Sequence, residues 1–387
     1  MIIEHQNIKK YTLGVLFLIF SRSKTFILTW IITIVLIASV LWRANAFKVL
    51  DTVRGGNLWY LGFALLLSVV TLLVKVIRWK LIHPDLKHVK VKDGLAYYSI
   101  GMYFSLLTIM KAGDAVKVFL LTVKDKIRAS IAIMTVFVDR LLELVAVVLL
   151  CIIGFLFYSK KAGFVPFRTE LLIGVMIGLI LVLSLIIAKS EWLIPLVRKI
   201  DPFLQLSVQK FSKRTRNVDF EQITLEFGQA FREYLRNSQT LFMTTGLSIL
   251  AWGIYTLQFL FIAAAFGLYI QLDSLADWGS LFFVVVTAAI ISQLPISIGG
   301  IGSRDYAYIL LLEALNYKPV VVTTATLVQS VIGILAPSLI GAVLTPRYMI
   351  NNKEKEGKET TLRTTQDTGA TTSVSGSSVG SSLTKGK

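Results

Sequence analysis

A proline and three glycines interrupt an apolar run at positions 295–305, in the sequence PISIGGIGSRD, and two opposite charges follow them. Backbone that is not helical is tolerated inside a bilayer only where protein or a water-filled cavity satisfies its polar groups. Pro295 removes a helix donor. Three glycines permit tight or left-handed turns: Gly299, Gly300 and Gly302. These features predict a break in a membrane helix and a new helix that begins near Ser303.

The start of this new helix could bind an anion. Its first N–H groups have no helical partner and carry the positive end of the helix dipole, so they attract a group such as phosphate. Arg304 adds a guanidinium that can hold phosphate with two parallel hydrogen bonds. The alternative is a structural turn in which Arg304 pairs with a neighbouring carboxylate. The stretch does not fit a nucleotide-binding loop, because it lacks both G-x-G-x-x-G and G-K-[ST].

A second polar cluster lies in KAGDAVKVF, after the apolar segment 94–110. Lys111, Asp114 and Lys117 are spaced at i, i+3 and i+6, which predicts one shared helical face. Gly113 again marks a break in the helix. The functional interpretation is a charged wall of a cavity, and the alternative is an amphipathic helix with a solvated face.

A third cluster, VFVDRLLELV, places charges inside an otherwise apolar span. Asp139 and Glu143 share a face at i, i+4, and Arg140 lies beside them. A charge in the middle of a span costs roughly 2.5–3.5 kcal/mol on insertion scales, so these three need partners or a wet cavity. A structural salt bridge to Lys111, Arg78 or Arg304 and a role in a substrate cavity are both open, and the two are compatible. Arg78 and Trp79 themselves are interpreted as anchors at the membrane interface.

The composition identifies the elements that must position these clusters as membrane helices. Of 387 residues, 55% are hydrophobic and 16% charged, and the mean hydropathy is +0.70. A soluble domain would carry roughly 25% charged residues. The net charge of +17 is expected from cytoplasmic loops and contacts with anionic lipids, and no soluble basic domain supports nucleic-acid binding. The single cysteine, Cys151, allows no internal disulfide, and the three histidines lie in polar loops, so no metal site or other cofactor is predicted.

The predicted fold is an all-α polytopic membrane protein. About six full spans are expected, near 26–42, 57–77, 129–157, 171–188, 240–267 and 320–345. The distribution of Lys and Arg puts both termini in the cytoplasm. Orientation is then consistent only if segments 94–126 and 279–317 each enter and leave on one side. They become two broken or re-entrant hairpins of opposite orientation, as in an inverted-repeat transporter, or two pairs of short spans.

Three regions flank or interrupt the transmembrane domain predicted at 26–348. Residues 1–25 are a cytoplasmic leader with no cleavable signal pattern. The cytoplasmic loop 189–238 contains DFEQITLEFGQAFREYL, whose apolar residues recur at helical spacing and predict an interfacial amphipathic helix. Residues 349–387 are rich in Ser, Thr and Gly and are expected to be disordered.

These motifs, in this order and spacing, resemble the flippase-bearing transmembrane region of lysylphosphatidylglycerol synthetases and its stand-alone bacterial and archaeal relatives. The resemblance covers about residues 20–348. Gly113 and Asp114 match the family's Gly-Glu, although the proline usual nearby is missing. Asp139 and Arg140 match an acid–Arg pair, with Glu143 where an Asp is common. The late motif matches Pro…Gly-Gly-x-Gly-x-Arg-Glu, with Asp305 in place of the Glu. No aminoacyl-transfer or glycosyltransferase domain accompanies these motifs, so the chain itself is not expected to synthesise lysyl lipids.

Together, the motifs and the resemblance predict a protein of the plasma membrane that translocates an anionic phospholipid or polyprenyl-phosphate-linked lipid between leaflets. The expected headgroup contacts are Arg304, Gly299, Gly300, Gly302, Ser303, Lys111 and Lys117. The expected switching ion pairs involve Asp114, Asp139, Arg140, Glu143 and Asp305. No catalytic residue is predicted.

Other functions and partners stay open. The alternatives are an enzyme or accessory component of glycolipid or lipid-modification assembly, and a secondary transporter of a small anion. Membrane lipids are the predicted partners. A separate lipid synthase or glycosyltransferase, or a second copy of the chain, are further partners that the sequence leaves open.

Overall fold

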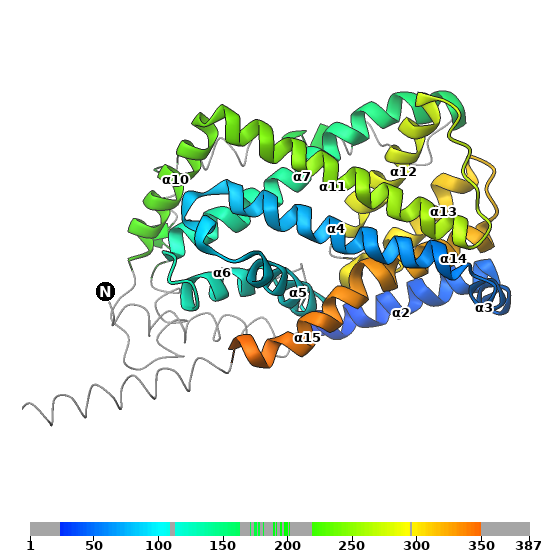
Figure 1. Ribbon diagram of the computed structural model, residues 1–387, viewed down its shortest axis with the longest axis horizontal. Helices are drawn as coiled ribbons and strands as arrows, with labels where there is room; N and C mark the ends of the chain where they lie inside the picture. Colours follow the sequence, from blue (N-terminus) through cyan, green and yellow to red (C-terminus); the bar gives the residue numbers. More distant parts are fainter. Residues whose placement is uncertain are drawn as a thin grey trace, which may run out of the picture. The chain divides into compact units, whose positions relative to one another are not determined.

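The computed structural model describes residues 24–108, 113–162, 219–294 and 296–349, with individual residues between 171 and 201. Residues 1–23, most of the predicted span 171–188, the tail from 350, Lys111 and Pro295 lie outside this part. The chain divides into two units, 1–342 and 343–387, and the arrangement below is that of the first. Every regular element in the described part is a helix, which confirms the predicted all-α class (Figure 1).

Long apolar helices form the framework: α2 (Lys24–Ala44), α4 (Leu58–Ile82), α7 (Ala129–Ala162), α11 (Ser238–Ala265), α12 (Leu275–Gln293) and α14 (Pro319–Ser330). The last continues through a π-helical turn, η5 (Val331–Leu335), into α15 (Ala336–Met349). Five helices in the described part are long and apolar enough to cross a membrane. A sixth crossing results if α2 and α3 (Ala46–Arg54), which meet at an 80° bend, count as one. The spans predicted near 26–42, 57–77, 129–157, 240–267 and 320–345 are therefore confirmed as helices.

Small residues allow α7 and α12 to pack closely. A Cβ added at Gly154 would lie 2.7 Å from the carbonyl oxygen of Gly279, and one added at Gly279 would overlap the ring of Phe157. Next to this contact, the rings of Tyr158 and Phe283 lie 4.6 Å apart in a core shared by α7, α11, α12 and α13. Such close approach is how helices associate in lipid, where burial of apolar surface gives little net gain.

The first predicted hairpin consists of α5 (Val91–Leu107) and α6 (Asp114–Val123), after the short turn η1 (Pro84–His88). At Gly113 an added Cβ would collide with the carbonyl oxygen of Gly101 and with Ser105. The glycine is therefore required by the close contact between α5 and α6, since its φ of −58° is open to any residue. The α6 helix has 10 residues and is about 15 Å long, half the thickness of a bilayer core.

The second hairpin consists of α12, the turn η4 (Ile298–Gly300) and α13 (Ser303–Glu313). The predicted break is confirmed, because Gly299, Gly300 and Gly302 have φ of 62°, 78° and 87°. The new helix begins at Ser303, as expected, and its 11 residues are again too few to cross. Helix α12, with 19 residues, is long enough to cross, so in this segment the alternative of a genuine span applies to α12 and not to α13.

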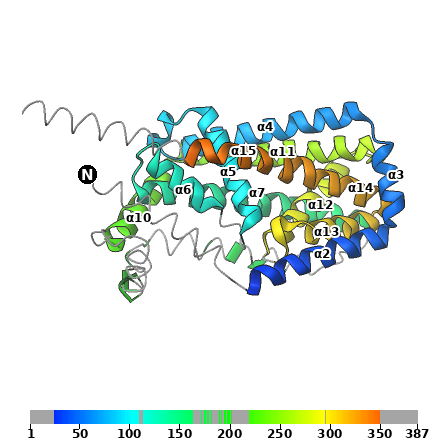
Figure 2. The ribbon, with the colours of Figure 1, turned by 90° about the horizontal axis from the view of Figure 1, so that it is seen from below.

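The two hairpins enter from opposite ends of the helical unit. The first follows the C-terminal end of α4, and Lys124 after α6 returns there to pair with Asp93 at 3.2 Å. The second returns to the end where α4 begins, since the Asn57 N–H donates to the Ala265 carbonyl there and Arg43 of α2 pairs with Glu313 at 2.6 Å. Figure 2 shows α5 and α6 toward the end with α10, and α12 and α13 toward the end with α3. Opposite orientation is thereby confirmed.

The predicted amphipathic helix is present as α10 (Phe220–Arg236). Its rings Phe227 and Phe231 meet Phe137 of α7 edge-on, with centroids 5.8 and 6.1 Å apart. Ser130, at the start of α7, donates to Glu226 at 2.5 Å. The apolar face of α10 thus packs on α7, and its position at a membrane interface stays a prediction.

Candidate functional site: a charged cavity between two hairpins

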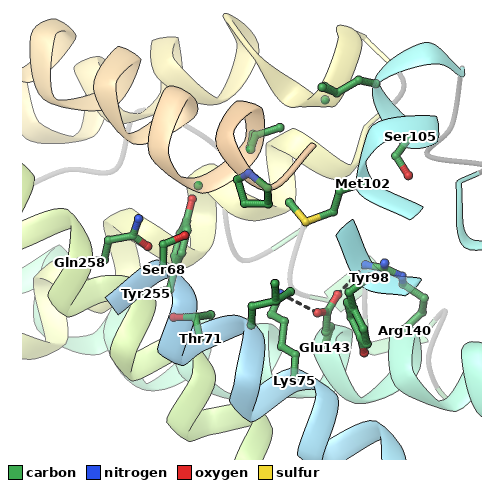
Figure 3. A pocket seen from close by; sticks show the side chains of 16 residues that line it. Ser68, Thr71, Lys75, Tyr98, Met102, Ser105, Arg140, Glu143, Tyr255 and Gln258 are labelled. Atoms are coloured by element: carbon green, nitrogen blue, oxygen red, sulfur yellow. Dashed lines mark hydrogen bonds and ion pairs between the residues drawn. The ribbon is translucent and has the colours of Figure 1, made fainter. Parts of the chain in front are cut away.

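A cavity of about 190 Å³ lies where the two hairpin breaks meet. The first hairpin contributes the end of α5, and the second contributes Gly299, where an added Cβ would lie 3.0 Å from Leu106. Helices α4, α7 and α11, the η5 turn and Pro337 at the start of α15 complete the wall (Figure 3). Three charged side chains line it: Lys75, Arg140 and Glu143. Their side chains are 28%, 41% and 9% exposed, so the two cations are the accessible charges.

A local irregularity shapes the part of the wall that the η5 turn supplies. In the π-helical turn the Ala336 N–H donates to Val331 instead of Ile332. Residue 337 is proline and has no N–H to offer, so the Ile332 carbonyl lacks a helical partner. The hydroxyl of Ser68, on the cavity side of α4, donates to it at 3.3 Å. This contact joins α4 to the η5 turn beside the cavity.

Glu143 and Asp139 connect the cavity to a deeper layer of charges. Lys75 pairs with Glu143 at 2.8 Å, and Arg78 approaches the same carboxylate at 3.4 Å. Arg78 pairs with Asp139 at 2.5 Å, and both side chains are completely buried. The Tyr98 hydroxyl also donates to Asp139 at 2.6 Å. The prediction that Asp139 and Glu143 share a helical face holds, because both reach Arg78.

The first hairpin joins the same network through α6. Arg140 donates from two nitrogens to Asp114, one of them at 2.8 Å, and from a third to Glu143 at 2.7 Å. Lys117 pairs with Asp114 at 2.9 Å and with Asp139 at 3.5 Å. The shorter Asp114 side chain therefore still reaches the arginine. The resulting network has seven members: Lys75, Arg78, Lys117, Arg140, Asp114, Asp139 and Glu143.

Arg304 is not in the cavity wall. It is 3% exposed and lies one hydrogen bond behind the wall, donating to the hydroxyl of Tyr255 at 3.1 Å. It also donates to Ser330 and to Asp305, the latter at 3.4 Å. The geometry found is thus that of the alternative interpretation, in which Arg304 pairs with a neighbouring carboxylate.

The start of α13 is also occupied by protein groups. The Asp305 carboxylate accepts from the Gly302 N–H at 2.9 Å and so caps the helix. The Ser303 hydroxyl lies 2.8 Å from that of Ser297. An anion could reach the Gly302 N–H only if Asp305 moved. Of the predicted headgroup contacts in the described part, Gly299 lines the cavity, whereas Lys117 and Arg304 lie behind its wall.

The interpretation of Arg78 and Trp79 as interfacial anchors is wrong. Both are completely buried, because Arg78 turns inward to the acids of α7. Lys75 was missed altogether, although a charge inside LLVKVIRW, one turn before Arg78, is a readable signal on one helical face. Tyr255 and Gln258, which line the cavity from α11, carry no comparable sequence signal.

No group of three His, Cys, Asp or Glu side chains in the described ranges is arranged to hold a metal ion. The cavity offers charged, hydroxyl and amide groups on an otherwise apolar wall. Chemically, this arrangement can bind and pair an ion or a charged headgroup.

The fold and this site define a multi-pass membrane protein in which two opposed broken hairpins meet at a charged cavity. Residues 26–341 match the family described as the lysylphosphatidylglycerol synthase TM region, and the chain belongs to this family. It is 24% identical to a UPF0104 membrane protein of Pyrococcus horikoshii over 336 residues, which are 81% of this chain and 94% of the relative. A UPF0104 membrane protein of Methanothermobacter thermautotrophicus is 23% identical over 341 residues, with 84% and 96% covered. Membership implies a role connected with membrane lipids.

Proposed function

We propose that this protein translocates a lipid with an anionic, phosphate-bearing headgroup between the leaflets of the plasma membrane, with both termini in the cytoplasm. The carrying observation is the charge of the cavity network, which holds four cations against three carboxylates. An unmatched buried charge is costly unless it finds a partner. A phosphate that enters the cavity would supply that partner.

Lys75 is the first contact we assign to the headgroup. Its ammonium has three donors, and its ion pair in the network is the one with Glu143. Arg140 is accessible too, but Asp114 and Glu143 already engage three of its nitrogens. Lys75 can therefore bind a phosphate with less rearrangement than Arg140. Arg140 would bind the headgroup next, after it releases Asp114.

The second hairpin would take part by a similar exchange. If Asp305 released the Gly302 N–H, the start of α13 and the Arg304 guanidinium would both become available to a phosphate. In this scheme Asp114 and Asp305 are the acids that leave their partners when the headgroup arrives. Lys117 and Asp139 hold the deeper layer in place.

The test is lipid movement in proteoliposomes that contain the purified full-length chain. Fluorescent phosphatidylglycerol and a labelled polyprenyl phosphate serve as probes, with dithionite quenching of the outer leaflet as readout. Lys75→Met keeps the apolar stem and removes the charge. Loss of a charge-assisted hydrogen bond of about 1.5–3 kcal/mol corresponds to about a 10- to 100-fold slower rate. The matched control is Arg54→Met, since the Arg54 side chain is 72% exposed and its ion pair with Asp51 is long, at 3.9 Å.

Two results would overturn the proposal. One is the absence of movement for both probes with folded wild-type protein. The other is a Lys75→Met variant that moves lipid as fast as Arg54→Met. A small soluble anion would suit the same charges and the limited volume of the cavity, so uptake of labelled inorganic phosphate is measured in the same vesicles. Phosphate uptake without lipid movement would assign the protein to that class instead.

A further inference from the structure

Buried polar groups without a hydrogen-bond partner concentrate in one part of the molecule. Eight such side-chain atoms occur among the described residues, and six of them belong to α11, α13 and α14. These six are Gln258 Nε2, Arg304 Nε, Tyr308 Oη, Thr323 Oγ1 and both polar atoms of the Gln329 side chain. Buried polar groups in proteins are almost always satisfied by protein or by ordered water. A concentration of six on three neighbouring helices points to internal water.

The six atoms follow a path that starts at the cavity. Gln258 lines the cavity, and Tyr255, one turn earlier on α11, accepts from Arg304. Tyr308 lies four residues beyond Arg304 on α13, about 6 Å further along the axis. Its hydroxyl is close to the Gln329 carboxamide, although neither completes a hydrogen bond of normal geometry.

Helix α14 continues the path in the same direction. Residues 314–318 connect α13 to α14, so positions early in α14 lie beside the late part of α13. Thr323 is four residues after the first residue of α14, about 6 Å from the helix start. The path therefore leads from the cavity toward the end of the unit where the Arg43–Glu313 ion pair lies. The N-terminus is predicted to be cytoplasmic, so this end, where α2 finishes after its first crossing, is expected to face the outside.

The buried hydroxyls of α14 are not all satisfied by their own helix. Thr324 donates to the Val320 carbonyl at 2.9 Å, and Thr326 donates to the Thr323 carbonyl at 3.1 Å. The hydroxyl of Thr323 makes no such bond, although its side chain is completely buried. Thr323 and Thr326 thus form a matched pair on one helix, with one hydroxyl unsatisfied and the other bonded.

We propose that α11, α13 and α14 enclose a compartment of internal water that extends the cavity toward residues 314–318. This compartment is the outer half of the path taken by the headgroup, an assignment that rests on the proposed lipid translocation. The polar atoms that a headgroup would meet there are already in place, and water forms their hydrogen bonds when no headgroup is present.

The water is tested by X-ray hydroxyl-radical labelling of the full-length protein in lipid nanodiscs, with mass spectrometry of the tyrosines. Radicals form wherever water lies, so a buried side chain is labelled only if water is next to it. Tyr308 and Tyr158 are both completely buried, but the Tyr158 hydroxyl donates to the Leu311 carbonyl at 2.7 Å. We expect labelling of Tyr308 to be several-fold faster. Equal protection of the two tyrosines would overturn the compartment.

Two substitutions then distinguish a hydroxyl that is bonded to internal water from one that is buried without water. Thr323→Val removes the unsatisfied hydroxyl, and Thr326→Val removes the bonded one on the same helix. With water present, Thr323→Val slows the labelling of Tyr308 and Thr326→Val does not. A higher melting temperature of Thr323→Val with unchanged labelling is the result expected of a dry, unsatisfied hydroxyl, and it would overturn the proposal.

Lipid movement tests separately whether the headgroup passes through this compartment. Thr323→Val and Gln329→Leu are expected to slow lipid movement several-fold at unchanged yield and melting temperature. Fast labelling of Tyr308 together with wild-type rates in both variants would refute the path while the water compartment stands. Because the labelling does not depend on transport, failure of the proposed lipid translocation would leave that result intact and distinguishable.

Discussion

Replacing Asp139 by Asn would remove the most buried carboxylate of the cavity network. Asp139 has no exposed side-chain surface and accepts from Arg78 at 2.5 Å, from Tyr98 at 2.6 Å and from Lys117 at 3.5 Å. The substitution keeps the shape and removes the charge, so the excess of positive charge in the network rises from one to two.

The size of the effect follows from what each cation retains. Removing one partner of a buried ion pair costs about 3–5 kcal/mol. Arg78 would still approach Glu143 at 3.4 Å, and Lys117 would keep Asp114 at 2.9 Å. The amide oxygen of the new Asn can still accept one hydrogen bond. We therefore expect a loss of about 3 kcal/mol in the free energy of unfolding, at the lower end of that range.

The assay is the apparent melting temperature in detergent, read by fluorescence-detected size-exclusion chromatography after heating. The control is Glu313→Gln, which breaks the partly exposed Arg43–Glu313 pair and should cost about 0–1 kcal/mol. Adding Arg78→Met to Asp139→Asn removes the stranded cation and should restore part of the lost stability. If Asp139→Asn melted no lower than Glu313→Gln, the reasoning that buried pairing stabilises this site would fail.

Three other changes test separate features by melting temperature. Gly113→Ala should lose about 1–3 kcal/mol because the new methyl group meets the α5 backbone, whereas Gly246→Ala, with open space, should be neutral or slightly stabilising. Tyr255→Phe should cost about 1–3 kcal/mol, since it leaves a buried Arg304 donor without a partner. Burial lowers the pKa of His83 below its usual 6.5. Because the unfolded chain then takes up a proton more readily, stability should fall as the pH drops below about 6.5, and a His83→Gln variant should lose this dependence.

Features that are costly in an apolar sequence could be predicted from the sequence alone. Gly299, Gly300 and Gly302 predicted the break in the helix, because a left-handed backbone has a low energetic cost only for glycine. The charges of Asp139, Arg140 and Glu143 predicted a cavity or an ion-pair network, because unpaired charges are costly in the middle of a membrane span. In both cases a local physical penalty identifies the position without any knowledge of the fold.

The choice of partners could not be predicted, because it depends on packing between distant segments. Arg78 lies 61 residues from Asp139 in the chain, and its local sequence, a basic residue beside Trp79 at the end of an apolar run, is also typical of an interfacial anchor. Only the packing of α4 against α7 and α11 turns it inward. Arg304 was predicted to face the headgroup for a similar reason, since the hydroxyls of Tyr255 and Ser330 that engage it come from other helices.

The two hairpins hold their charges differently, and this difference favours exchange over simple binding. At the second hairpin Arg304 and Asp305 neutralise each other, and Asp305 also caps α13. At the first hairpin the cations outnumber the acids, so the attraction for an anion is greatest beside Lys75 and Arg140. An anion held there must compete with Asp305 before it can reach Arg304. Its transfer between the hairpins would therefore require Asp305 to leave its partners, and in the proposed translocation this requirement would couple headgroup movement to a change in α13.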